Sequence, residues 1–281
     1  MATDSDARPI VTQFTDPMCA WCWGTEPIVR HLHVAYGGQL QFEYVMGGLV
    51  RDFEEFYDAA NDISTPAEAA PHWLEASRAH GMPVETRVLK ENPPRSTYPA
   101  NIAFMAARLQ DREVAHRYLR RLREAYATEG INVSDREAQI RLTESIGLDT
   151  DAFIAALNDG RAREAFEADL DRARSAAVLG FPSYRVAGPS GKRLATGFQS
   201  FGALVAHLES VANDLDRSSP PPIREFVIKW DPIATQEVAE VYDLALSKAR
   251  QVLQSLADNG AVRSEPRGNG FFWHADEGGK D

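Results

Sequence analysis

Thr15-Asp16-Pro17-Met18-Cys19-Ala20-Trp21-Cys22-Trp23-Gly24 is the stretch that decides the fold, because it holds both cysteines of this 281-residue chain, two residues apart. The preceding run Ile10-Val11-Thr12-Gln13-Phe14 alternates as a β-strand does, and Asp16-Pro17 is a turn signal ahead of residues with helical spacing. We therefore expect Cys19 at or near the N-terminus of a helix.

That position would make Cys19 reactive, since the unpaired N–H groups and the positive dipole end of a helix stabilise a thiolate. The pKa of Cys19 is expected to fall from roughly 8.5 into the range of about 3.5–7.5. Cys22 lies one turn further on the same face, where its thiol can attack a mixed disulfide at Cys19. We expect Cys22 to be the more buried and less acidic thiol.

Two other interpretations of the pair stay open at this point. Cysteine is commonly buried, so both thiols could be purely structural. A zinc site would have His31 and His33 as its nearest further ligands. That arrangement fits zinc poorly, because the histidines follow too closely and no second cysteine pair exists.

The composition is that of an ordinary globular chain, with 44% hydrophobic and 25% charged residues, and it needs no disulfide to fold. Residues 1–8 are polar and acidic rather than signal-like, and no run of 18 apolar residues occurs, which favours a cytoplasmic location without membrane contact. In that compartment a cysteine pair is more often catalytic than structural. A net charge of −11 disfavours nonspecific binding to nucleic acid or anionic membrane.

The segment after the cysteines predicts a strand–helix–strand unit. Residues 26–36 keep helical spacing, with Pro27 expected to kink or restart the helix, and Gly37-Gly38 ends it. Residues 39–46 alternate as a second strand. A βαβ unit whose first turn carries two cysteines at this spacing is typical of a thioredoxin-like fold.

A large helical insertion is expected over residues 51–178. Caps and breaking glycines predict helices at 66–80, 99–110, 113–128, 135–146, 151–157 and 161–177. Strand-type sequence resumes at 180–186 and 192–198, as a hairpin followed by a helix over 201–211. Pro182 opens the first of these strands, where proline is usually trans but could be cis.

Three features together resemble the DsbA family of the thioredoxin superfamily, and more closely its cytosolic FrnE-like branch. They are the stretch 16–24 after the first strand, the helical insertion, and Gly180-Phe181-Pro182-Ser183-Tyr184 before the hairpin. The resemblance spans residues 10–212. The related kappa glutathione transferases and hydroxychromene carboxylate isomerases are less similar, because their active position is typically serine and lacks the second cysteine.

The resemblance implies an α/β, thioredoxin-like thiol–disulfide oxidoreductase in which Cys19 attacks, Cys22 resolves, and no metal or organic cofactor is needed. Pro182 would be a cis-proline facing the pair, and the backbone of Phe181 would pair with an extended substrate strand. Trp21, Phe181 and Pro182 are accordingly the expected substrate-binding residues.

The carboxy-terminal part begins with residues 213–222, which are polar and then proline-rich and indicate a linker. Beyond it the pattern predicts two helices at 234–242 and 246–257 and two short strands at 261–263 and 270–273. This order resembles a winged helix-turn-helix, although Asp243 replaces the usual turn glycine and no preceding helix is clear over 224–230. Phe271, Phe272 and Trp273 are expected in the core of this small domain.

If this part bound DNA, its second helix would face the major groove and two arginines of the wing would lie near phosphates. The residues concerned are Ser247, Lys248, Arg250, Gln251, Gln254, Arg263 and Arg267. From residue 223 onward, however, seven basic residues stand against ten acidic ones, whereas DNA-binding domains are usually basic on one face. Contact with a partner protein or a second copy of the chain is therefore favoured over DNA.

The sequence thus predicts a thioredoxin-like domain (1–50 and 179–212), a helical insertion (51–178), a linker (213–222) and a winged-helix-like domain (223–276). The favoured function is disulfide exchange by Cys19 and Cys22 with protein or small-molecule thiols and disulfides. The alternative is a redox-sensing adaptor or transcriptional regulator, in which oxidation of the pair changes what the carboxy-terminal domain binds.

Overall fold

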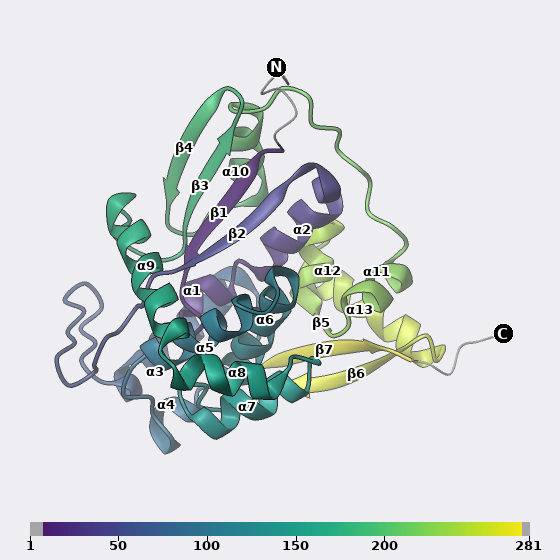
Figure 1. Ribbon diagram of the computed structural model, residues 1–281. Coiled ribbons are helices and arrows are strands. Elements are labelled where there is room, and N and C mark those ends of the chain that lie inside the picture. Colours follow the sequence, from purple (N-terminus) through teal and green to yellow (C-terminus); the bar gives the residue numbers. More distant parts are fainter. Residues whose placement is uncertain (1–7, 277–281) are drawn as a thin grey trace.

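The computed structural model describes residues 8–276 and contains two β-sheets with helices packed around them (Figure 1). The larger sheet has the order β2-β1-β3-β4, formed by β1 (Ile10–Thr15), β2 (Gln41–Met46), β3 (Ser183–Gly188) and β4 (Gly191–Thr196). β1 and β2 are parallel, whereas β3 runs antiparallel to both β1 and β4. The predicted strands and hairpin are confirmed, and the C-terminal end of the central strand β1 lies in the middle of the sheet.

Helices α2 (Glu26–Tyr36) and α10 (Phe201–Glu209) cover one face of this sheet, and α9 (Arg161–Ser175) packs on the other. Pro27 lies in the first turn of α2, where a backbone N–H has no acceptor within the helix, so its missing N–H costs no helical hydrogen bond. The helix therefore restarts there, as expected. The apolar contacts that join these layers include Val11, Ile28, Leu32, Tyr184, Leu204 and Leu208 on the first face and Phe14, Val45 and Ala173 on the second.

Between β2 and β3 the chain forms the predicted helical insertion. Its helices are η3 (Pro66–Glu68), α3 (Ala69–His80), α4 (Val88–Glu91), α5 (Tyr98–Arg108), α6 (Arg112–Thr128), α7 (Arg136–Glu144), α8 (Thr150–Asn158) and then α9. Only the short α4 was not expected from the sequence. A four-residue helix is a single turn, which is too short to display an amphipathic period.

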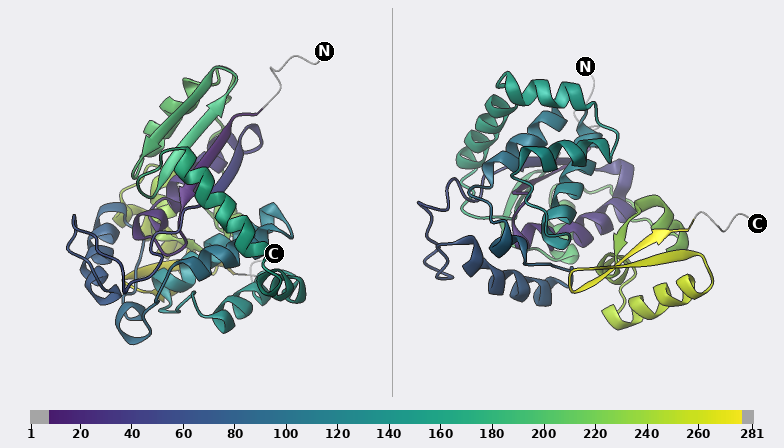
Figure 2. Two further views of the ribbon diagram at one scale, coloured as in Figure 1. Left: turned by 60° about the vertical axis from the view of Figure 1, so that its left-hand side comes forward. Right: turned by 90° about the horizontal axis from the view of Figure 1, so that it is seen from below.

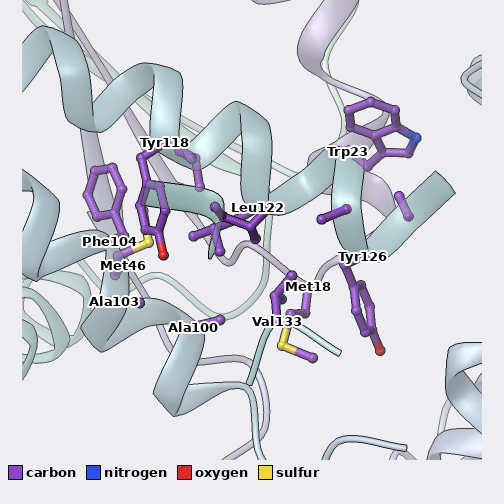
Figure 3. Packing of buried hydrophobic residues seen from close by; sticks show 14 of the residues in the cluster. Met18, Trp23, Met46, Ala100, Ala103, Phe104, Tyr118, Leu122, Tyr126 and Val133 are labelled. Carbon is purple, nitrogen blue, oxygen red and sulfur yellow. The ribbon is translucent and has the colours of Figure 1, made fainter. Parts of the chain in front are cut away.

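The insertion packs directly against the cysteine segment. Tyr118, Leu122 and Tyr126 recur every four residues on one face of α6, and Figure 3 shows them among the buried side chains that include Met18 and Trp23. All five side chains are at most 3% exposed. Burial of each contributes on the order of 1.5–3 kcal/mol, so this core fixes α1 (Ala20–Trp23) against the insertion.

The carboxy-terminal part contains α11 (Ile223–Trp230), β5 (Ile233–Ala234), α12 (Thr235–Val241), α13 (Leu246–Asp258), β6 (Val262–Arg267) and β7 (Gly270–Ala275), with sheet order β5-β7-β6. The two predicted helices and two strands are present. The helix α11, which has no clear signal in the sequence, precedes them and buries Phe226 and Val227. The winged-helix interpretation of this order stays a prediction.

This part packs against the rest of the molecule (Figure 2). At the β6–β7 turn, the Asn269 N–H donates to the Val84 carbonyl oxygen at 3.0 Å, and the Val84 N–H donates to Asn269 Oδ1 at 2.8 Å. Gly268 has φ +55°, and a Cβ there would lie 2.4 Å from the Val84 carbonyl oxygen, so the contact requires glycine. The turn is therefore seated on the helical insertion.

Phe272 differs from its expected place in the small domain's own core. Its ring stacks on Trp23 at 6.4 Å between centroids and belongs to the largest core cluster, whereas Phe271 and Trp273 pack within the carboxy-terminal part. Segment 213–222 is also anchored, because Ser218 N donates to Ala35 O at 2.8 Å. The cysteine helix and the carboxy-terminal hairpin thus share one core.

Candidate active site

The turn between β1 and α1 is fixed by the buried carboxylate of Asp16. It accepts hydrogen bonds at 2.8 Å from the backbone N–H groups of Met18 and Leu49 and from the side chains of Thr97 and Asn101. Burial nevertheless raises the pKa of Asp16 above its usual value. These four partners join the cysteine turn to the chain after β2 and to the start of α5, and so set where α1 begins.

Cys19 is the N-cap of α1, as the sequence predicts. The Cys22 N–H donates to Cys19 Sγ at 3.4 Å, and neither cysteine is in a disulfide. Cys19 is 5% exposed and Cys22 is 0% exposed, which confirms that Cys22 is the more buried thiol. Cys19 is therefore the more accessible of the two buried thiols.

The acidities of the two thiols differ from the expectation. The hydrogen bond with the Cys22 side chain, together with burial, raises the pKa of Cys19 well above its usual value. Burial opposes ionisation of Cys22 as well, but the hydrogen bond from Cys19 and the charge of Arg123 lower the pKa of Cys22. The cation of Arg123 thus favours negative charge at Cys22.

Arg123 of α6 is the cationic group beside Cys22. Its side chain is fully buried, and its guanidinium pairs with Glu26 and donates to the Thr15 hydroxyl. The Thr15 hydroxyl in turn hydrogen-bonds the Cys22 sulfur. The sequence analysis did not identify Arg123. Its only indication there is that Arg123 follows Leu119 by four residues, which places a charged residue on the apolar face of α6.

The segment before β3 forms the other wall of the site. The Phe181–Pro182 peptide bond is cis, and the carbonyl oxygen of Phe181 lies 3.8 Å from Cys19 Sγ, which donates to it. The Phe181 ring packs against Gly47, where a Cβ would lie only 1.9 Å from the ring. The structure thus brings the Phe181–Pro182 peptide to Cys19, as the resemblance implies.

Trp21 lies at the rim of the site and is partly exposed. Its Nε1 donates to His72 Nε2 at 3.2 Å, and its ring lies 6.0 Å from His80 and 5.9 Å from Phe198. Phe198 is 37% exposed, and Leu179, two residues before Phe181, is 95% exposed. The sequence did not single out His72, His80 and Phe198, whose rings surround Trp21 with aromatic surface.

The two candidate zinc ligands lie elsewhere. His31 stacks on Phe201 at 3.5 Å and approaches Glu240 at 3.2 Å, while His33 stacks on Phe42 at 3.8 Å. Among residues 8–276 no group of three or more His, Cys, Asp or Glu side chains could hold a metal ion. Within the same span no helix is long and apolar enough to cross a membrane. Residues 1–7, part of the segment examined for a signal peptide, lie outside the described range.

The residues considered for DNA contact fall into two groups. Arg250 lies over the Phe271 ring at 4.2 Å, and Lys248 donates to Gln251 at 3.0 Å on the exposed side of α13. Ser247, Lys248, Arg250, Gln251 and Gln254 on α13 and Arg263 on β6 are all exposed.

Arg267 does not share that exposure. Its guanidinium contacts Glu265 at 2.7 Å, Glu129 at 3.1 Å and Glu124 at 3.8 Å, and its side chain is 15% exposed. These carboxylates take up its charge at the seated β6–β7 turn. This corrects the expectation that Arg267 is available to phosphates on the wing.

A family model described as thioredoxin matches residues 13–192, which is more than half of the chain. The match runs from β1 through the insertion to β4 and includes Cys19, Cys22 and Pro182. Among curated proteins, the ClpXP adapter protein SpxH of Shouchella clausii is 28% identical over 265 residues, which cover 92% of this chain and 86% of that protein.

Two solved structures share the fold. A Nitrosomonas europaea protein described as a protein disulfide isomerase has a TM-score of 0.63 at 21% identity and covers 73% of this chain and 97% of its own. The cytosolic disulfide reductase DsbM of Pseudomonas aeruginosa has a TM-score of 0.55 at 19% identity and covers 72% and 93%. These likenesses confirm the thioredoxin-like α/β fold with a helical insertion.

Proposed function

We propose that this chain, which belongs to the thioredoxin family and is DsbA-like, is a thiol–disulfide oxidoreductase that acts on protein or small-molecule thiols and disulfides. The observation that carries the proposal is the placement of Cys19. Its sulfur caps α1 and lies 3.8 Å from the Phe181 carbonyl oxygen, Cys22 follows one turn later, and Cys19 is the less buried of the two cysteines.

The reduced pair holds one readily shared proton. Transfer of the Cys19 proton to Cys22 makes Cys19 the thiolate that attacks a substrate disulfide; the substrate S–S bond breaks, and one substrate thiol leaves with a proton. Cys22 then loses its proton and attacks the Cys19 sulfur of the mixed disulfide, which releases the second substrate thiol. Two electrons pass to the substrate, and the reverse sequence oxidises a dithiol.

Arg123 and Thr15 assist the second step. Because they lower the pKa of Cys22, a larger fraction of Cys22 is thiolate when the mixed disulfide forms. A thiolate attacks a disulfide and a thiol does not, so the lowered pKa speeds release of the substrate. Full burial of Cys22 limits its attack to the sulfur of Cys19.

Substrate binding is assigned to the backbone and rim beside Cys19. The Phe181 backbone pairs with an extended strand of substrate, which gives binding that tolerates many sequences. Trp21, Phe198 and Leu179 offer apolar surface to the residues that flank the substrate cysteine. We place the reaction in the cytoplasm, where a catalytic dithiol fits the reducing environment.

The test is reduction of insulin disulfides by the wild type and two single variants. Cys19→Ser is expected to lose activity. Cys22→Ser is expected to retain the first attack and accumulate a mixed disulfide that mass spectrometry detects and dithiothreitol releases. Each variant is the other's control, since both remove one thiol from the same helix. Wild-type turnover in Cys19→Ser would reject the assignment.

A second candidate function is that of a redox-sensing protein adaptor. The SpxH relative aligns with 92% of this chain, so the likeness extends into the carboxy-terminal part, whereas the two disulfide-exchange structures cover about three quarters of it or less. We propose that the part 223–276 is a winged-helix-like module that contacts a partner protein rather than DNA. The division into domains at 50, 178, 212 and 222 belongs to the same proposal.

The adaptor function is tested with purified ClpXP, because that protease is named for the relative. The oxidised or reduced full-length chain is added to ClpXP with proteins extracted from its own organism, and protein half-lives are followed by mass spectrometry. A restricted set of proteins should be degraded faster, to a different extent in the two redox forms. Unchanged half-lives in both forms would contradict the adaptor function and leave the disulfide exchange intact.

A further inference from the structure

Glu237 of α12 is a fully buried carboxylate at the contact between the carboxy-terminal part and the rest of the chain. It pairs with Arg120 of α6 at 2.8 Å and with Arg30 of α2 at 3.1 Å, and it accepts from the Ala234 N–H at 2.7 Å. One side chain of α12 therefore bonds to α6, which packs against the cysteine helix, and to α2, which follows that helix in the chain.

The ionic contacts continue from Glu237 to the cysteines. Arg120 also contacts Glu26 at 3.2 Å, and Glu26 pairs with the buried Arg123. Arg123 reaches Cys22 through Thr15. The contacts therefore run without a break from Glu237 to Cys22. Arg120 bridges Glu237 and Glu26, and Arg123 bridges Glu26 and, through Thr15, Cys22.

These groups influence one another because they are shielded from water. The side chains of Glu237 and Arg123 are 0% exposed, Glu26 is 9% exposed and Arg120 is 13% exposed. In such surroundings a charge acts over a longer distance than at the surface, and neighbouring hydrogen bonds polarise one another. A change of charge at either end therefore alters the bonds at the other.

We propose that Glu237 is a positioning residue of the redox centre, because through Arg120 and Glu26 it sets how strongly the Arg123 guanidinium interacts with Cys22. Glu237 thereby couples the docking of α12 to the redox state of the cysteine pair. The proposal rests on the disulfide exchange proposed above. Because Glu237 pairs with Arg120, Arg120 pairs less strongly with Glu26. Glu26 then pairs more strongly with Arg123 and weakens the interaction of Arg123 with the thiolate.

The coupling has a definite sign. The reduced pair with one thiol and one thiolate, a substrate disulfide and one proton give the Cys19–Cys22 disulfide and two substrate thiols, so oxidation removes one negative charge beside Arg123. Because Glu237 is itself negative and draws Arg120 from Glu26, it disfavours the thiolate and so favours the disulfide. By linkage, the disulfide favours docking of α12 to the same extent.

The test compares Glu237→Gln with Glu240→Gln in the full-length chain. Glu240 is the matched control, since it lies one turn along on the same helix and pairs with His31 of α2 but does not contact Arg120. In Glu237→Gln the equilibrium with glutathione should shift toward the dithiol by about fivefold or more, the lower end of ordinary coupling between sites. The pKa of Cys22, followed by thiolate absorbance, should fall, while Glu240→Gln should match the wild type in both.

A second measurement needs no variant. Hydrogen exchange of the wild type should be slower over residues 235–241 in the disulfide form than in the dithiol form, and equal in both forms over 201–209, since α10 lies outside the ionic chain. Wild-type equilibria in Glu237→Gln, or equal exchange in α12, would overturn the proposal. If the wild-type pair exchanged no disulfide at all, the proposed function itself would fail instead.

Discussion

Replacing Arg123 with methionine should destabilise the chain more than any surface ion pair could. The side chain is fully buried, so its removal leaves the Glu26 carboxylate without one of its two cations in the core. Breaking a buried pair from one side typically costs about 3–5 kcal/mol. Arg120 remains 3.2 Å from Glu26, so we expect the lower end of that range, about 3 kcal/mol.

The assay is thermal and urea unfolding of the reduced protein at pH 7. A loss of about 3 kcal/mol should lower the Tm by roughly 6–12 °C in a chain of this size. Arg121→Met is the matched control: it lies on the same helix and pairs with Glu129 at 2.7 Å, but both side chains are 20–22% exposed. It should cost roughly 1 kcal/mol or less.

Two further readouts separate the electrostatic argument from a simple packing defect. Adding Glu26→Gln to Arg123→Met removes the stranded carboxylate, so the double variant should recover part of the loss, with a coupling of about 0.5–3 kcal/mol. Arg123→Met should also raise the pKa of Cys22, since its cation is gone. Equal destabilisation by Arg121→Met and Arg123→Met, together with an unchanged Cys22 pKa, would refute the reasoning.

Two other properties of the structure can be checked directly. Gly268→Ala should destabilise the chain by roughly 1–3 kcal/mol more than Gly260→Ala. Both glycines have positive φ, but only at Gly268 would an added Cβ lie 2.4 Å from a carbonyl oxygen. Equal Tm values of the two variants would contradict the close contact of the β6–β7 turn with Val84. Burial lowers the pKa of His33 to about 3 and of His116 to about 4, so both imidazoles are neutral in the folded protein. Their contribution to stability is therefore complete above pH ~6.5, the pKa of an unfolded histidine, and declines as the pH falls toward 4. Between pH 7 and 5, each histidine should lower the free energy of unfolding by about 2 kcal/mol, and His116→Gln should make this decline smaller. A free energy of unfolding that is the same at pH 5 and pH 7 would rule the argument out.

The sequence predicts those features of the site that depend on neighbours in the chain. The strand before Asp16, the turn and the two cysteines at helical spacing place Cys19 at a helix N-terminus, and the structure agrees. The position of Pro182 beside the pair came from resemblance, because nothing local in Gly180 to Tyr184 specifies that it returns to Cys19. A family pattern carries such long-range information and a propensity does not.

The acidities of the thiols could not be predicted in the same way. The helix N-terminus argument applies to Cys19 alone, whereas the pKa of Cys22 also depends on burial, on the hydrogen bond from Cys19 and on the charge of Arg123, which lies on a helix of the insertion. That arginine lies among apolar residues of α6 and has no sequence motif of its own. Local chemistry therefore points to the two cysteines but does not include the buried cation that lowers the pKa of Cys22.

The carboxy-terminal part illustrates the same difference at the level of domains. Composition suggests a linker and a separate module, because prolines and polar residues at 213–222 are typical of a flexible connection. Yet Phe272 stacks on Trp23, and Glu237 is buried among cations of two other helices. A partner that pulled this whole part away would remove Phe272 from Trp23 and leave Arg120 with two carboxylates instead of three. Binding at the module and chemistry at the cysteines are therefore energetically coupled. The two functions proposed above, disulfide exchange and partner binding, would therefore depend on one coupled structure.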